Sequence, residues 1–128
     1  MSKYSVNNFK KSFVFALKGL RIALKSQKNL RIQCFVGILA IIFAFVLKFS
    51  HIEFCLLFIV IGAVFICELF NSVIEFVLDA TYRNKYSKLV EMSKDMAAGC
   101  VLISSVLSIV VGSILFLDKL IPIIIARF

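Results

Sequence analysis

The residues best suited to chemistry lie within residues 68–79, where polar side chains interrupt an otherwise apolar stretch. Three carboxylates and one carboxamide recur there at positions i, i+3, i+7 and i+11: Glu68, Asn71, Glu75 and Asp79. On an α-helix, at about 100° per residue, these four side chains form one narrow stripe about 16 Å long. We call this set the acidic stripe. Its oxygens suit cation binding or proton transfer.

The acidic stripe falls within a segment that is apolar enough to cross a membrane. Ionisable side chains at membrane depth are costly and usually mark a functional site. The structural alternative is an ion pair with a neighbouring helix that serves packing alone. Because the stripe carries three acids and residues 54–79 contain no Lys or Arg, we expect a cation to face it.

The composition is that of a membrane protein. Of the 128 residues, 62% are hydrophobic and 14 are Phe, and the mean hydropathy is +1.03. A soluble domain of this length is rarely so apolar. The length indicates one domain, 1–128. The four cysteines lie in apolar stretches without metal-type spacing, so we expect them to act as small hydrophobic residues.

Hydropathy and charge together predict an all-α membrane protein with four helical segments. Residues 6–25 are two-faced, with Phe and Leu on one side and Lys and Arg on another, which is typical of a helix lying in the membrane interface. Three candidate spans follow, at about 30–49, 54–79 and 96–117.

The segments between these spans are expected to be short. Residues 50–53 are predicted to form a tight connection, and 81–93 a polar one. The third span is expected to end at Asp118 and Lys119. An apolar tail broken by Pro122 should follow.

Lys and Arg are distributed unevenly along the chain. Eight lie in residues 1–31 without any acid, and four lie in 80–95, against one in the first connection and two after residue 118. Cytoplasmic segments carry the excess of Lys and Arg, so the amino end and the second connection are expected to face the cytoplasm. Beside spanning helices, basic segments more often bind anionic lipid, and no nucleic-acid partner is expected.

An acidic stripe at headgroup level, near a basic helix, suits a site that holds a cation and a phosphate together. Mg²⁺ is bound through a few oxygen ligands plus substrate phosphates, and Asn71 and Glu75, adjacent on a helix, can supply two. Phosphoryl transfer also needs a positive side chain on the phosphates and a base near the attacking hydroxyl. Lys94 fits the first role. Glu68, the acid nearest the bilayer core, fits the second.

Two motifs carry a specific resemblance: ELFNSVIEFVLD at 68–79 and KDMAAG at 94–99. Together with 12–20 and 29–32, they resemble the signature of the bacterial integral-membrane diacylglycerol kinase family, which includes the undecaprenol kinases. The resemblance implies a homotrimer in the bacterial cytoplasmic membrane, with three spans and one surface helix per subunit and active sites between subunits. It also implies Mg²⁺-dependent transfer of the ATP γ-phosphoryl group to the hydroxyl of a lipid alcohol.

By position, the resemblance implies a role for each polar residue of these motifs. Glu68 matches the catalytic base, Asn71 its polar neighbour, and Glu75 a metal-binding carboxylate. Nucleotide contacts are expected from Asp79, Lys85, Tyr86, Ser87, Lys94 and Asp95. Contacts with substrate in and beside the surface helix are expected from Phe15, Lys18, Arg21 and Arg31.

Gln27 departs from the family pattern, which usually has a second metal-binding glutamate there. Glutamine keeps an oxygen ligand and loses a charge, so Gln27 is a candidate ligand expected to bind metal more weakly. An assembly-only family member is the alternative that this departure suggests.

The lipid is expected to be undecaprenol, with diacylglycerol as the alternative. Residues 97–103 and 12–16 are more similar to the undecaprenol kinase branch, but both lipids present a primary hydroxyl near the interface. A non-enzymatic ion or proton path is the main rival function. It would distribute acids through the whole membrane depth, whereas the first half of 54–79 contains none.

Overall fold

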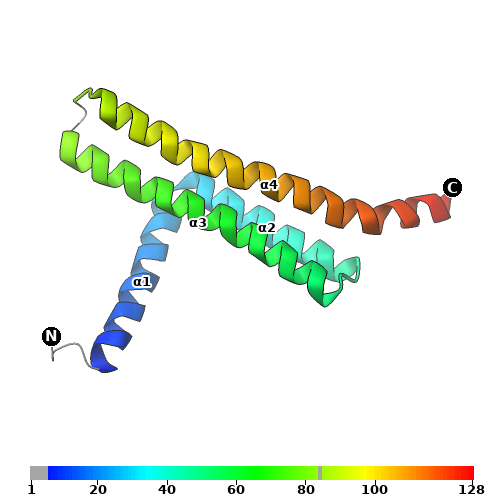
Figure 1. Ribbon diagram of the computed structural model, residues 1–128. Coiled ribbons are helices and arrows are strands. Elements are labelled where there is room, and N and C mark those ends of the chain that lie inside the picture. The colour runs from blue at the N-terminus through cyan, green and yellow to red at the C-terminus, as the bar shows by residue number, and fades with distance from the viewer. Residues whose placement is uncertain (1–5, 84) are drawn as a thin grey trace.

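The computed structural model describes residues 6–83 and 85–128, and this part of the chain forms four α-helices and no strand. They are α1 (Val6–Ser26), α2 (Lys28–Val46), α3 (His51–Tyr82) and α4 (Lys88–Arg127). Helices α2, α3 and α4 lie side by side, whereas α1 projects away from them at a steep angle (Figure 1). The last three helices are long and apolar enough to cross a membrane. The predicted all-α membrane fold is therefore confirmed.

The junction between α1 and α2 is fixed by a side chain rather than by a long loop. The guanidinium of Arg31 donates hydrogen bonds from Nη1 to the carbonyl oxygens of Leu24 and Lys25, both at 2.8 Å. The last carbonyls of a helix have no partner within the helix. Arg31 therefore caps the carboxyl end of α1 from the first turn of α2.

The connection between α2 and α3 occupies residues 47–50, slightly before the predicted 50–53. Lys48 adopts a left-handed conformation with φ 58°, and the Phe49 amide donates to the carbonyl of Ala44 at 3.0 Å. Ser50 then begins α3 with a capping box: its Oγ accepts from the Glu53 amide at 3.3 Å, and its own amide donates to Glu53 Oε1 at 2.9 Å. These local hydrogen bonds reverse the chain within four residues.

Helices α3 and α4 are longer than predicted, and the connection between them is shorter. Helix α3 extends to Tyr82, and α4 begins at Lys88, so the predicted connection over 81–93 narrows to 83–87. Helix α4 continues through Lys119 and Pro122 to Arg127. The charged residues at 118–119 therefore do not end the helix, and Lys119 Nζ lies 3.1 Å from Oε1 of Glu53 on α3.

The best-packed region lies at the α2–α3 turn. The buried side chains there are Ala44, Phe49, Leu57 and Leu115, one or more from each neighbouring element. Farther along, α2 and α3 approach closely at Gly37, where an added Cβ would lie 3.1 Å from Cγ2 of Ile61. The acidic stripe lies toward the opposite end of α3, where the buried residues of this helix are the polar Glu68 and Ser72.

Candidate functional site

The acidic stripe passes from buried to exposed along α3. Glu68 is 4% exposed, Asn71 and Glu75 are half-buried, and the Asp79 side chain is 55% exposed. Ser72, beside the stripe, donates from Oγ to the carbonyl oxygen of Glu68 at 3.0 Å. A gradient of this kind is expected for a helix whose far end leaves the apolar region, and it makes Glu68 the most enclosed acid of the stripe.

The buried end of the stripe has a partner that sequence reasoning missed. Gln33 on α2 donates from Nε2 to Oε2 of Glu68 at 3.4 Å. Oε1 of Gln33 is buried and has no hydrogen-bond partner among the described residues. The signal in the sequence was a single carboxamide just inside the first span, but nothing local places it beside Glu68.

The exposed end of the stripe meets α4. Lys94 Nζ lies 2.8 Å from Asp79 Oδ1, and the Glu75 carboxylate is close enough to Lys94 to attract it electrostatically. The acids of α3 and the cation predicted for the phosphates therefore meet within one chain.

A surface pocket of about 270 Å³ lies beside this ion pair. It contains five of the six residues predicted to contact nucleotide, the exception being Asp95, which is exposed on α4 outside the pocket lining. The lining residues are Leu78, Asp79, Tyr82, Lys85, Tyr86, Ser87, Val90, Glu91 and Lys94. The lining carries two lysines, two carboxylates and three hydroxyls, and its lysines and hydroxyls are groups that can contact an anionic ligand.

Within this surface pocket, the Tyr86 hydroxyl donates to Oε2 of Glu91 at 2.7 Å. The hydrogen bond to this carboxylate stabilises the protonated phenol and raises the pKa of Tyr86 above its usual value. Tyr86 is therefore a neutral hydrogen-bonding group at physiological pH.

The candidate metal ligands come from two helices of the described chain, Asn71 and Glu75 from α3 and Gln27 from the start of α2. Residues 6–83 and 85–128 contain no group of three or more His, Cys, Asp or Glu placed to hold a metal ion. Glu75 lies on α3, and Gln27 lies at the start of α2 with an extended backbone and no side-chain cap. Asn71 and Glu75 still supply two oxygens of the kind Mg²⁺ binds alongside substrate phosphates, so this donor set fits a phosphate-bridged ion.

The surface-helix candidates lie apart from the stripe of their own chain. Phe15, Lys18 and Arg21 are exposed on α1, which points away from α3 and α4 (Figure 1). Lys18 Nζ is 5.9 Å from the centroid of the Phe15 ring, within range of a cation–π contact. Arg31 is committed to the carboxyl end of α1. In the described part of the chain, none of these four side chains makes a hydrogen bond or ion pair with the acidic stripe.

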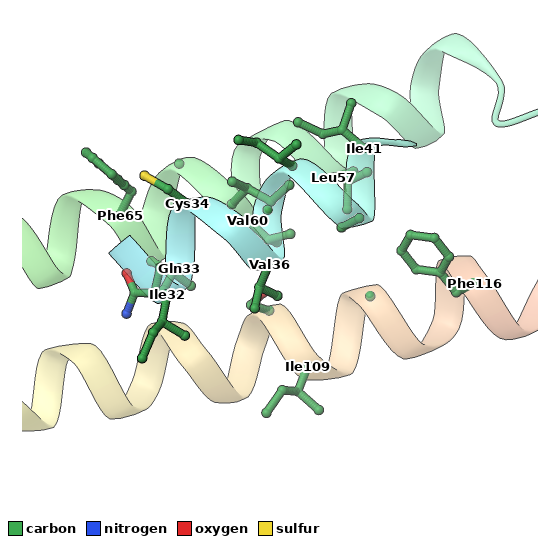
Figure 2. A pocket seen from close by; sticks show the side chains of 18 of the residues that line it. Ile32, Gln33, Cys34, Val36, Ile41, Leu57, Val60, Phe65, Ile109 and Phe116 are labelled. Atoms are coloured by element: carbon green, nitrogen blue, oxygen red, sulfur yellow. The ribbon is translucent and has the colours of Figure 1, made fainter. Parts of the chain in front are cut away.

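An apolar groove of about 890 Å³ runs between α2, α3 and α4. Figure 2 shows Ile32 and Gln33 at one end of the groove and Phe116 at the other. Three glycines, Gly37, Gly62 and Gly112, are among its lining residues, and its polar lining residues are Gln33, Ser108 and Ser113. Because Gln33 contacts Glu68, the polar end of this groove adjoins the buried end of the acidic stripe.

Together these features define a multi-span, all-α membrane protein in which a helix carries acids from membrane depth to a lysine-containing surface pocket. The model of the family described as prokaryotic diacylglycerol kinase matches residues 14–116. The chain belongs to this family, which confirms the resemblance drawn from its motifs.

Three bacterial proteins are similar to this chain in sequence. The chain is 34% identical over 115 residues to the undecaprenol kinase of Bacillus subtilis (strain 168), covering 90% of this chain and 93% of that relative. It is 36% identical over 109 residues to the diacylglycerol kinase of Synechocystis sp., covering 85% of this chain but only 62% of that relative. With the diacylglycerol kinase of Haemophilus influenzae the identity is 32% over 103 residues, covering 80% and 86%. The family and these names support a lipid kinase.

Proposed function

We propose that this protein is an ATP- and Mg²⁺-dependent lipid kinase that phosphorylates undecaprenol, with diacylglycerol as the alternative substrate. The single observation that carries the proposal is the course of the acidic stripe. It leads from buried Glu68, beside the apolar groove, to Asp79 and Lys94 at the surface pocket. A membrane-soluble alcohol and a water-soluble nucleotide can approach such a stripe from opposite ends.

In the proposed reaction, residues of the surface pocket and of the exposed part of the stripe bind the nucleotide and the metal. The triphosphate lies near Lys94, whose charge offsets that of the phosphates, and the nucleotide contacts the surface pocket at Lys85, Tyr86 and Ser87. Asp95 and Asp79 border this region. Asn71 and Glu75 would hold Mg²⁺, which would supply positive charge against the phosphates.

Glu68 accepts the hydroxyl proton as the lipid oxygen bonds to the γ-phosphorus. The bond from that phosphorus to the bridging oxygen breaks, and ADP leaves with the electron pair. The phosphorylated lipid carries the transferred group, so atoms and charge balance without a covalent enzyme intermediate. Asn71, one turn from Glu68, supports the polar surroundings of the base.

The apolar groove is proposed to hold the hydrocarbon chain of the lipid. Its lining is almost wholly apolar, and its polar end lies at Gln33 beside Glu68. A chain seated there would present its hydroxyl at the base. Undecaprenol is placed first because the similarity to the undecaprenol kinase of Bacillus subtilis extends over 93% of that relative.

We further propose a homotrimer in the bacterial cytoplasmic membrane with the amino end on the cytoplasmic side. The orientation rests on the excess of Lys and Arg before residue 32 and around residues 80–95. The trimer is supported by the position of α1. Helix α1 projects away from α3 and α4 of its own chain (Figure 1), so in a trimer Phe15, Lys18 and Arg21 would approach the stripe of a neighbouring subunit.

The test is phosphoryl transfer by the detergent-purified protein. ATP labelled in the γ-phosphate is supplied with undecaprenol and diacylglycerol in parallel micelles, and label is measured in the organic phase. We expect Mg²⁺-dependent labelling of both lipids, faster with undecaprenol, and its loss on chelation of Mg²⁺. Absence of label from both lipids would contradict a lipid kinase, and faster labelling of diacylglycerol would reverse the order of substrates.

A further inference from the structure

The hydrogen bond between Gln33 and Glu68 joins two spans at the buried end of the acidic stripe. Gln33 Nε2 lies 3.4 Å from Glu68 Oε2, which is long for a hydrogen bond and close to its geometric limit. A carboxylate only accepts hydrogen bonds, so the amide nitrogen and not the oxygen must face it. This contact therefore fixes the orientation of the Gln33 side chain.

The two carboxylate oxygens of Glu68 differ in their hydrogen bonding. Oε2 accepts from Gln33, whereas Oε1 accepts from no described side chain. The one side-chain atom of the described residues that is both buried and unpaired is Gln33 Oε1. Glu68 as a whole is 4% exposed, and no hydrogen bond from a described residue reaches its Oε1. One carboxylate oxygen therefore accepts a hydrogen bond from Gln33, and the other has no hydrogen-bond partner among the described residues.

We propose that Gln33 is a positioning residue that holds Oε2 of Glu68 and leaves Oε1 free to accept the proton of the lipid hydroxyl. The inference rests on the proposed function, in which Glu68 is the base. It assigns to α2 a role in the reaction beyond lining the apolar groove.

The stability of the fold does not explain a carboxamide at this position. A buried acceptor without a donor destabilises a structure, and one long hydrogen bond compensates little. A side chain of equal length without polar atoms would fill the same space without leaving Oε1 of Gln33 unpaired. If Gln33 served only to join α2 to α3, removing its amide would loosen the pair of helices.

The test compares two substitutions that keep the length of the side chain. Gln33→Met removes both polar atoms, and Gln33→Glu places a carboxylate against the carboxylate of Glu68. For each we measure kcat, the KM values for ATP and lipid, and the melting temperature of the detergent-solubilised protein. The matched control is Ser104→Ala on α4. Ser104 is also a buried polar residue, and its Oγ bonds only the carbonyl of Val101.

We expect Gln33→Met to lower kcat on the order of 10- to 100-fold, as for a misplaced catalytic group, with an unchanged KM for ATP and a melting temperature at or above that of the wild type. Gln33→Glu should lower kcat at least as far, and Ser104→Ala should retain activity.

Two results would overturn the positioning role while leaving the kinase assignment intact. One is a wild-type kcat in Gln33→Met. The other is a fall in melting temperature together with kcat, which would make Gln33 a packing residue. An inactive wild-type protein would instead overturn the kinase assignment and this inference with it.

Discussion

Lys94 on α4 and Asp79 on α3 form an ion pair, with Nζ of the lysine 2.8 Å from Oδ1 of the aspartate. Both side chains are partly exposed, 40% and 55% respectively. Ion pairs between side chains this exposed contribute little to stability. The main consequence of the pair is therefore where it places the lysine, at the rim of the surface pocket, where the charge of Glu75 also attracts it.

Replacing this lysine should weaken nucleotide binding far more than folding. In Lys94→Gln, loss of a charge-assisted contact with phosphate should raise the KM for ATP about 10- to 100-fold. The melting temperature should change little, because the ion pair with Asp79 is exposed. Steady-state kinetics against ATP concentration and a thermal melt measure the two effects.

Lys88→Gln is the matched control for Lys94→Gln. Lys88 carries the same charge at the start of the same helix and does not line the surface pocket. An unchanged KM for ATP in Lys94→Gln, or an equal increase in both variants, would remove Lys94 from the nucleotide site.

Placing a carboxylate at position 27 should strengthen Mg²⁺ binding. We expect Gln27→Glu to lower the Mg²⁺ concentration that gives half-maximal activity by about 10-fold, because a second anionic ligand joins Glu75 at the metal. Asn29→Asp adds the same charge two residues away and controls for the general effect of charge. Equal Mg²⁺ dependence in all three proteins would show that position 27 is not a ligand.

The capping box at Ser50 should support the fold without affecting the reaction. Ser50→Ala removes the hydroxyl that accepts from the Glu53 amide, and we expect a loss of about 1 kcal/mol in stability. Ser50→Thr retains a capping hydroxyl and should melt close to the wild type. Activity of the folded Ser50→Ala protein should be preserved, since this turn lies at the opposite end of α3 from the acidic stripe. A loss of kcat at temperatures where the protein is folded would contradict that separation.

Mixing two inactive variants tests whether active sites are shared between subunits. Glu68→Gln lacks the proposed base, and Arg21→Gln lacks a candidate contact on α1. If α1 of one subunit serves the stripe of its neighbour, trimers formed from equal amounts of both should regain activity at about a quarter of their sites. Co-expression followed by the labelling assay measures this recovery. No recovery in mixed trimers would place the complete site within one chain.

Much of this architecture follows from local pattern. The all-α class, the two-faced first helix and the acidic stripe depend on periodicity and hydropathy, which a sequence records directly. Helix ends were predicted less well, because charge was taken as a boundary. Lys119 is charged yet lies inside α4, since Glu53 on another helix pairs with it. That partnership depends on tertiary packing, which the local pattern does not contain.

In the candidate site, too, contacts between residues near in sequence could be predicted, whereas contacts set by helix packing could not. Asp79 and the residues of the second connection are near in sequence, so a short reversal brings Lys94 to Asp79. Gln33 was missed because its contact with Glu68 depends on how α2 is aligned along α3. The positions of Phe15 and Lys18 relative to the stripe depend on the angle at which α1 leaves α2, and no periodicity within either helix specifies that angle.

The central claim is that the buried carboxylate of Glu68 takes the proton of the lipid hydroxyl. Its most direct test is the rate of label transfer from γ-labelled ATP to undecaprenol by Glu68→Gln, with Glu53→Gln as the matched change at the other end of the same helix. We predict that Glu68→Gln loses about 10²- to 10⁴-fold in kcat while the KM for ATP is unchanged and Glu53→Gln remains active. A wild-type rate in Glu68→Gln would contradict the claim.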